Sequence, residues 1–356
     1  MKYLTFLALL LGLYLASLLH GVVAEKRSKG CNKNLPKNSV IGDYRKISLN
    51  VNDPYYNGGE KIKRRFQIRL PKGYDNTEAL PLIYKAHGMG GKSEVLKKDS
   101  DFAKIARDRE DFILVLPDGM SQNWNTTWIE GAFGPTCDLP KKERNDCPKT
   151  CPECKRTKEE CYGGLGPCVD DLGFIELIQK EVRKSYCIDE NQMHFHGYSM
   201  GGALAWEIAS ATTDGLGFAT FYTQSSVPAL GFGLPHKEIN FSLFDVIGNQ
   251  DTSMPPTHDV KGTGMGPHNS IITKFGGLKP VKEELLQMWA EAMHCGDEEI
   301  YPTSLDGNKG FECHSRDCSN EQSIVRCTGD FGHWPPNQKP TADIVLDFML
   351  SHPRKQ

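Results

Sequence analysis

The sequence predicts an α/β fold, in which a mostly parallel central sheet is flanked by helices and carries a disulfide-rich insertion. Three observations predict it. Strand-like segments come first along the chain, and strands alternate with helices afterwards. A G-x-S-x-G pentapeptide, Gly197–Gly201, lies between a strand-like and a helix-like segment. Six cysteines crowd into residues 137–168, where apolar residues are too few to form a packed element.

The amino-terminal end has the pattern of a cleaved signal peptide. Within residues 1–24, Lys2 precedes an almost wholly apolar run from Leu4 to Leu19, and small residues follow at 22–24. The alternative is an uncleaved anchor, which the run disfavours because it is shorter than the ~20 residues of a comfortable span. We therefore expect a secreted, extracellular protein without stable membrane association.

After residue 24 we expect an irregular arm over residues 25–44 and one domain over residues 45–356. Periodicity predicts strands near residues 47–51, 66–70, 82–86, 112–116, 192–196, 241–248 and 323–327, and helices over residues 102–109, 172–184, 200–212, 281–293 and 344–350. Early strands followed by alternating strands and helices are typical of the α/β-hydrolase fold. Asp170 and Asp171 are expected to cap the helix that follows them.

The pentapeptide supplies a candidate nucleophile, Ser199. A bare match is also compatible with an ordinary turn, but here a strand enters the turn and a helix leaves it. This context places the serine on a strained elbow with its Oγ exposed. The amide of Met200, at the start of the helix, would face an oxyanion developing beside that serine.

An acid and then a histidine should follow this serine along the chain. Asp251 comes directly after the strand-like run 241–248, at the edge where α/β sheets hold their sites. Asp245 lies inside that run and is expected to be structural, and Asp259 is the reserve candidate for the acid. His333, in a Gly/Pro-rich loop before the final helix, is the expected base.

A second oxyanion donor is expected from the glycine-rich loop after the strand-like segment 82–86. We assign it to the amide of Met89, with Gly88 as the neighbouring possibility; the alternative is a plain flexible turn. His87 is expected to brace this loop by hydrogen bonds. His194 and His196, beside the elbow, are expected to be packed or hydrogen-bonded and not catalytic.

All 12 cysteines lie beyond the signal segment, which predicts a disulfide framework in an oxidising compartment. The same compartment argues against reading the Cys151-x-x-Cys154 pair as a zinc site, so we expect no metal. Cys31 and Cys187 are expected to tie the arm to the core. Four late cysteines are expected to staple the loops that lead to the base, although spacing leaves their pairing open: Cys295, Cys313, Cys318 and Cys327.

Two sequons, at Asn125 and Asn240, are candidate glycosylation sites. The formal net charge of −3 and the hydrophobic content of 38% give no sign of a nucleic-acid or membrane surface. The expected partner is therefore a substrate, and the sequence does not specify an oligomeric state.

With these residues placed, the chain resembles the secreted feruloyl esterase and polyhydroxybutyrate depolymerase-like group, related to carbohydrate esterase family 1. The resemblance runs from about Arg64 to Phe348 and rests on ordered motifs: His87–Gly91, Leu116–Gly119, Val169–Ile175, Gly197–Gly201, Gly248–Asp251 and Gly332–Pro335. It implies an α/β-hydrolase fold with nucleophile, acid and base at Ser199, Asp251 and His333. The segment between Trp128 and Val169 is longer and richer in cysteine than the group's pattern, which bears on substrate choice.

The expected function is that of a secreted serine carboxylesterase that works through an acyl-enzyme and needs no cofactor. The resemblance implies a feruloyl esterase that releases hydroxycinnamic acids from plant cell-wall polysaccharide. Trp334, Trp124 and Trp128 are candidates for aromatic surface that binds the substrate. The alternatives are a polyhydroxybutyrate-type polyester depolymerase, an acetylxylan esterase and a non-catalytic secreted binding protein.

Overall fold

A computed structural model describes most of the chain after the expected signal peptide. The described residues are 25–53, 61–122, 124, 169–211, 214–230, 232–235, 239–266, 269–273, 278–301, 311–334 and 338–355. The expected signal peptide at residues 1–24, the insertion at residues 137–168, the sequon at Asn125 and the side chain of Trp128 lie outside them. The division into an arm over residues 25–44 and a domain over residues 45–356 stays a prediction.

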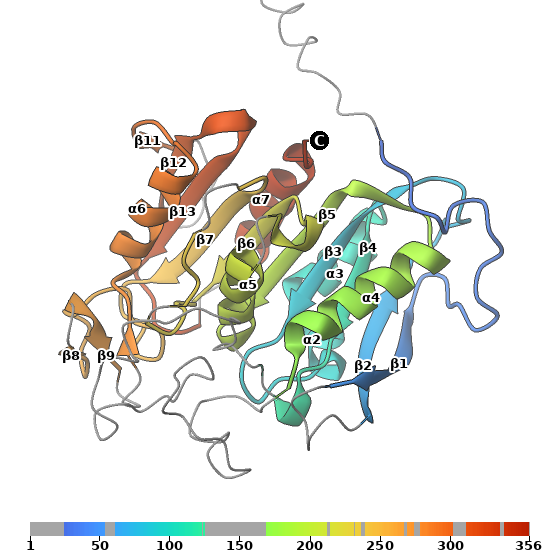
Figure 1. Ribbon diagram of the computed structural model, residues 1–356, viewed down its shortest axis with the longest axis horizontal. Helices are drawn as coiled ribbons and strands as arrows, with labels where there is room; N and C mark the ends of the chain where they lie inside the picture. The colour runs from blue at the N-terminus through green and yellow to red at the C-terminus, as the bar shows by residue number, and fades with distance from the viewer. Residues whose placement is uncertain are drawn as a thin grey trace, which may run out of the picture.

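In the described part of the chain, ten strands form one sheet in the order β1-β2-β4-β3-β5-β6-β7-β13-β12-β11 (Figure 1). Strands β4, β3, β5, β6, β7 and β13 pair in parallel in the middle, and the pairs at both edges are antiparallel. The mostly parallel sheet predicted from the sequence is confirmed. The strands are β1 (Tyr44–Asn52), β2 (Lys61–Arg69), β3 (Leu80–Ala86), β4 (Ile113–Pro117), β5 (Ile188–Tyr198), β6 (Thr220–Gln224), β7 (Ser242–Gly248), β11 (Glu299–Ile300), β12 (Phe311–Asp317) and β13 (Ser323–Gly329).

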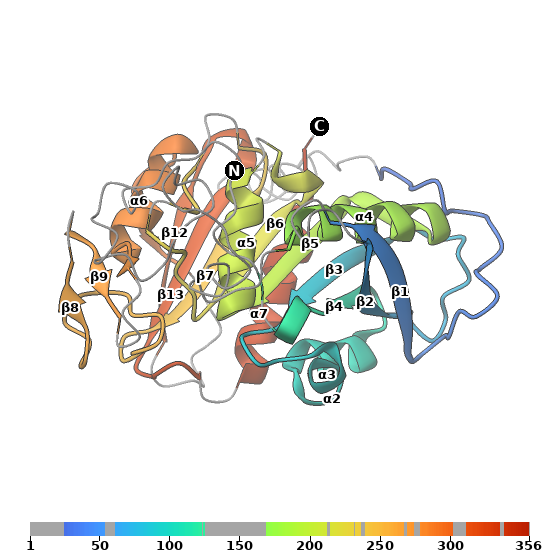
Figure 2. The ribbon, with the colours of Figure 1, turned by 60° about the horizontal axis from the view of Figure 1, so that its bottom comes forward.

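Helices cover both faces of this sheet (Figure 2). One face packs against α3 and α7, through side chains such as Phe102, Val345 and Phe348. The other face packs against α4, α5 and α6, through side chains such as Phe174 and Trp289. The helices are α2 (Ser93–Asp99), α3 (Asp101–Arg109), α4 (Asp171–Ser185), α5 (Met200–Ala211), α6 (Lys282–Ala292) and α7 (Gln338–Ser351), with 3₁₀ turns at Met120–Gln122, Gly215–Gly217 and Ser319–Glu321.

The two covered faces explain the composition of the central strands. β4, β6 and β7 are buried along their whole length, as parallel strands between two helical layers must be. β1 at the edge consists of exposed and half-exposed residues, and Val51 is its one buried residue. The sequence prediction omitted α2, β6 and β12, and it also omitted a small sheet of β8 (Gly264–Met265), β9 (Ile271–Ile272) and β10 (Leu278–Lys279).

The two aspartates at the start of α4 make different contacts. Asp170 caps the helix, because its Oδ1 accepts the Gly173 N–H at 2.8 Å. Asp171 does not cap; its buried carboxylate pairs with the guanidinium of Arg64 in β2. The expected capping therefore holds for the first aspartate, and the second ties the helix to the antiparallel edge of the sheet.

Three disulfides lie among the described residues, and none of the described cysteines is free. Cys31–Cys187 ties the segment before β1 to the start of β5, as expected. The late cysteines pair as Cys295–Cys318 and Cys313–Cys327, the second across the neighbouring strands β12 and β13. These two disulfides therefore stiffen the antiparallel edge of the sheet beside β13, the strand that leads to His333.

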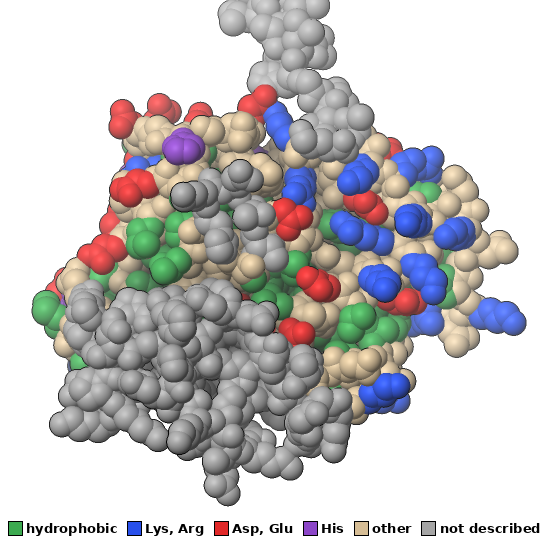
Figure 3. All heavy atoms as spheres, in the orientation of Figure 1, with side chains coloured by type: hydrophobic (Ala, Val, Ile, Leu, Met, Phe, Trp, Pro, Cys, Tyr) green, Lys and Arg blue, Asp and Glu red, His purple; other side chains and the backbone are tan. Residues whose placement is uncertain are grey.

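No helix in the described part of the chain is long and apolar enough to cross a membrane. Figure 3 shows Lys and Arg side chains gathered over α4 and the amino-terminal strands, with acidic side chains among them. This mixed surface accords with the small net charge of the chain.

Candidate active site

The elbow between β5 and α5 presents Ser199 at the carboxyl edge of the parallel sheet. Its φ of 53° lies in the left-handed region, which is costly for a serine and is held here by the packing around it. Two glycines make the turn possible. A Cβ on Gly197 would overlap the backbone of Gly201, and a Cβ on Gly201 would overlap the carbonyl oxygens at the end of β3. The Ser199 N–H donates to the Gln224 carbonyl of β6 at 2.9 Å, which fixes the turn to the neighbouring strand.

Asp251 and His333 come to this serine from the ends of two other strands. The Nδ1–H of His333 donates to Oδ2 of Asp251 at 2.7 Å, and the Ser199 hydroxyl donates to Nε2 of His333 at 2.9 Å. The Asp251 side chain is fully buried, and its Oδ1 accepts the N–H groups of Ser253 and Met254 at 2.8 and 2.9 Å. The imidazole is 18% exposed. The three residues therefore form a continuous series of hydrogen bonds with one end open to a cavity.

The loops that carry the acid and the histidine are bonded to each other. β7 and β13 lie side by side in parallel, and the Asn249 and Gln250 N–H groups donate to the carbonyls of Gly329 and Phe331 at 2.9 and 3.0 Å. The Tyr198 hydroxyl donates to the His333 carbonyl at 3.1 Å, and its ring lies 5.3 Å from the imidazole. Burial raises the pKa of this phenol, so it stays a neutral donor.

The loop after β3 approaches the serine closely. A Cβ on Gly88 would lie 3.0 Å from the Ser199 Cβ, so only glycine fits there without a shift. His87 braces the loop, as expected: its Nε2 accepts the Gly119 N–H at 3.0 Å, and its Nδ1–H donates to the Gly88 carbonyl at 2.7 Å. Burial lowers the pKa of His87, which keeps this ring neutral and its tautomer fixed.

The orientation of the Gly88 carbonyl sets the direction of the next amide. This carbonyl accepts from His87 and, at 3.0 Å, from the N–H of Gly91 within the loop. In a trans peptide the C=O and the following N–H point in opposite directions. The Met89 N–H is therefore directed away from these partners. The N–H of Met200, the first residue of α5, has no acceptor within its own helix.

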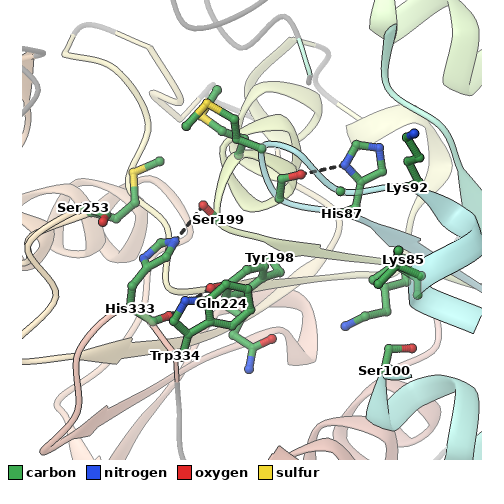
Figure 4. A pocket seen from close by; sticks show the side chains of 17 residues that line it. Lys85, His87, Lys92, Ser100, Tyr198, Ser199, Gln224, Ser253, His333 and Trp334 are labelled. Atoms are coloured by element: carbon green, nitrogen blue, oxygen red, sulfur yellow. Dashed lines mark hydrogen bonds between the residues drawn. The ribbon is translucent and has the colours of Figure 1, made fainter. Parts of the chain in front are cut away.

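A cavity of about 380 Å³ opens beside the serine. Its walls are mostly apolar or aromatic, with Leu96, Met254 and Tyr198 among them. Figure 4 shows Ser199 and His333 at one end of it and Lys85 and Ser100 at the other. Its size falls within the range of small-molecule pockets, so one drug-sized acyl or aryl group fits.

The two tryptophans that the structure describes differ in position. Trp334 is 69% exposed and lines the cavity, with its ring 4.8 Å from that of Tyr198. The expectation for Trp124 is corrected, because its side chain is fully buried. Its indole N–H donates to the His87 carbonyl at 2.7 Å, and its ring packs 4.8 Å from that of His87. Trp124 supports the loop from behind and presents no face to a ligand.

The other residues considered in the sequence analysis lie outside the Ser199–His333–Asp251 hydrogen-bond series. Asp245 lies in β7 and pairs with Lys282 at 2.6 Å, and Asp259 is exposed in a loop. His194 is buried and bonded to Thr220 and Gln192. Asn240, just before β7, is exposed, whereas Phe241 and Ser242 of its sequon are buried. The residues that the structure describes contain no cluster of His, Cys, Asp or Glu suited to a metal ion.

Sequence reasoning missed the polar end of the cavity, formed by Lys85, Ser100 and Gln224. One signal could have found it. Lys85 is the last residue but one of an otherwise mostly apolar strand of the kind that helices cover on both faces, where a lysine is rare without a partner.

The architecture defines an α/β-hydrolase fold with a Ser–His–Asp hydrogen-bond series at the carboxyl edge of its sheet. Solved structures share the fold. The native sOPH crystal structure is 14% identical, with a TM-score of 0.51 and coverage of 90% of this chain and 91% of its own. The complex of a pOPH variant with DMSO is 15% identical, with a TM-score of 0.50 and coverage of 90% of each chain.

Among curated proteins the chain is similar in sequence to feruloyl esterases, in agreement with the resemblance stated above. "Feruloyl esterase B" of Piromyces equi is 22% identical over 294 residues, which are 81% of this chain and 46% of that protein. "Probable feruloyl esterase C" of Aspergillus clavatus is 23% identical over 202 residues, which are 55% and 53%. The chain thus spans about half the length of these relatives. No protein-family model matches it.

Proposed function

We propose that this chain is a serine carboxylic ester hydrolase, with Ser199 as nucleophile, His333 as general base and Asp251 as the group that orients the histidine. The proposal is carried by one observation, the hydrogen-bond series from Asp251 through His333 to Ser199 at the wall of a cavity. The similarity to feruloyl esterases supports an ester as the substrate.

The reaction proceeds in two halves. Ser199 Oγ attacks the ester carbonyl carbon while Nε2 of His333 takes the hydroxyl proton, and the imidazolium is stabilised by Asp251. The tetrahedral intermediate collapses to an acyl-enzyme as His333 returns the proton to the departing alcohol. Water then repeats the sequence on the acyl-enzyme and releases the carboxylic acid and the free serine.

The amides of Met89 and Met200 stabilise the negative oxygen of both intermediates. The Met200 amide stands at the start of α5, where orphan N–H groups and the helix dipole favour an anion. The Met89 amide owes its direction to the Gly88 carbonyl, which His87 and Gly91 hold on the opposite side. Preorganised donors of this kind are worth about 10²–10³-fold in rate.

The substrates we propose are hydroxycinnamoyl esters of plant cell-wall polysaccharide. The apolar and aromatic walls of the cavity suit an aryl acyl group, and the exposed face of Trp334 at its rim suits a ring of the substrate. We further propose that the protein acts outside the cell, which the three described disulfides support.

The test is hydrolysis of methyl ferulate by the full chain and by Ser199→Ala. We expect Ser199→Ala to lower kcat by about 10⁴-fold or more, as the loss of a serine nucleophile does elsewhere. Ser185→Ala, at the end of α4 and outside the cavity, is the matched control and should keep wild-type rates.

The outcomes separate the alternatives. Turnover of 4-nitrophenyl acetate without turnover of methyl ferulate would keep the mechanism and move the substrate to acetylated sugars or polyesters. No turnover of either ester would favour a secreted binding protein. Equal activity in Ser199→Ala and the wild type would remove Ser199 from the chemistry.

A further inference from the structure

The polar end of the cavity contains a buried cation without a carboxylate. Lys85 is 4% exposed and lines the cavity from β3. No acidic group among the described residues forms a salt bridge with it; Asp101 acts on it only at longer range. Buried ammonium groups are costly unless they are paired, so an unpaired one that borders a cavity is a position where a ligand group can complete the arrangement.

The described partners of Lys85 are two uncharged rings, that of His196 and that of Phe102, whose centroid lies 5.2 Å from Nζ. Nζ donates to Nδ1 of His196 at 3.0 Å, and Nε2–H of the same ring donates to the Gln224 side-chain oxygen at 3.3 Å. Burial and the nearby charge of Lys85 hold the pKa of His196 well below its usual range. This ring therefore accepts one bond from the amine and supplies no countercharge.

Two further polar groups border the same end. The Gln224 side chain uses its oxygen for His196, and its amide nitrogen has no hydrogen-bond partner among the residues that the structure describes. Ser100 caps α3 by accepting the Ala103 N–H at 3.2 Å, so its own hydroxyl proton remains to be donated. Both side chains are more than nine-tenths buried and line the cavity with Lys85.

We propose that Lys85, together with Gln224 and Ser100, forms a subsite that binds a phenol oxygen at the far end of the acyl group while the ester carbon lies at Ser199. This inference rests on the proposed ester hydrolase function and deepens it, because it assigns the selection of the acyl group to Lys85.

The chemistry of the amine favours a phenol over a carboxylate. Burial lowers the pKa of Lys85 to about 7, so both protonation states of the amine are populated near neutral pH. The ammonium donates to a phenol oxygen and the neutral amine accepts from a phenol O–H, whereas only the ammonium can hold a carboxylate. The mostly apolar wall between the two ends suits an aromatic ring.

The test compares methyl 4-hydroxycinnamate with methyl cinnamate, which differ by one hydroxyl group. We expect wild-type kcat/KM to favour the hydroxy ester by about ten-fold or more, the size of one hydrogen bond to a charged or strongly polar partner. Lys85→Met keeps the length and volume of the side chain. It should reduce this ratio to within about two-fold while methyl cinnamate is still hydrolysed, which also shows that the variant folds.

Lys92→Met makes the same chemical change at the exposed rim of the cavity and should leave the ratio as in the wild type. The proposal is overturned if the wild type does not discriminate, if Lys85→Met keeps the preference, or if Lys92→Met removes it.

A binding experiment distinguishes failure of this proposal from failure of the proposed function. Calorimetric titration of Ser199→Ala with each ester measures the subsite without chemistry. Preferential binding of the hydroxy ester that disappears in Ser199→Ala/Lys85→Met supports the subsite even if the wild type hydrolyses neither ester. Equal binding of both esters overturns the subsite even if the wild type hydrolyses both.

Discussion

Lys85 and Lys282 are two of the three lysines buried among the described residues, and their surroundings differ in one respect. Lys282, at the start of α6, is 3% exposed, donates to Asp245 at 2.6 Å and to the Ser226 carbonyl at 2.8 Å, and lies over the Trp206 ring. Lys85 is equally buried and lies over the Phe102 ring, yet its described hydrogen-bond partner is a neutral histidine and its amine borders the cavity. Lys282 therefore has a carboxylate in direct contact, whereas the described contacts of Lys85 include none.

The largest effect is expected from breaking the paired site. Asp245→Asn leaves the Lys282 ammonium buried without a countercharge, which should cost about 3–5 kcal/mol of unfolding free energy. Urea unfolding measures it, with Asp259→Asn, at an exposed aspartate, as a control expected to change stability by less than about 0.5 kcal/mol. If the double variant Asp245→Leu/Lys282→Met is no more stable than Asp245→Asn, the ion-pair explanation is wrong.

A smaller effect distinguishes the unpaired lysine. The pKa of Lys85 is lowered to about 7 in the folded chain, whereas in the unfolded chain it is near 10. Between these two pH values the native state therefore binds fewer protons than the unfolded state. Wild-type stability therefore gains about 1 kcal/mol per pH unit from this group as pH rises through that window. Lys85→Met lacks the group and should be more stable than the wild type at pH 6, with an advantage that shrinks toward pH 9.

This difference is measured by urea unfolding of both proteins at a series of pH values, so that contributions from other groups cancel. Two parallel stability curves would mean that Lys85 titrates normally, and the contrast with Lys282 would then be one of position alone.

The smallest effect comes from making the two sites alike. Ser100→Asp adds a carboxylate to the polar end of the cavity and remains a good helix cap. It should raise the pKa of Lys85 and lower the preference for the hydroxy ester by about three- to ten-fold, since a resident anion occupies the amine. Ser100→Asn is the neutral isosteric control. Equal ratios in the Asp and Asn variants would show that the added charge does not reach Lys85.

The sequence allowed the frame of the site to be predicted because each part depends on local rules. The elbow needs glycines beside the serine, the acid follows an apolar strand, and the histidine follows the last parallel strand; the hydrogen bonds among Ser199, Asp251 and His333 agree with that placement. Their catalytic roles stay predictions until the nucleophile is tested.

The residues around Ser199, His333 and Asp251 could not be predicted, because their positions depend on the register and packing of segments that are distant in sequence. Lys85 meets His196 since β3 and β5 pair in a particular register, and Ser100 reaches the same end through the packing of α3. Trp124 looked like ligand-binding surface in the sequence, but the fold places it behind the His87 loop. β6, only five residues long and wholly buried, has no periodicity to reveal it.

The bonds between the loops after β7 and β13 have a consequence for how such a chain can change. Asp251 and His333 are 82 residues apart in sequence, yet strand register and two backbone hydrogen bonds set their separation. The described elements between β7 and β13 include α6 and the small sheet of β8, β9 and β10, so the chain leaves one strand of this pair and returns to the other. Connections within that part of the chain can therefore change in length while the distance between Asp251 and His333 stays constant.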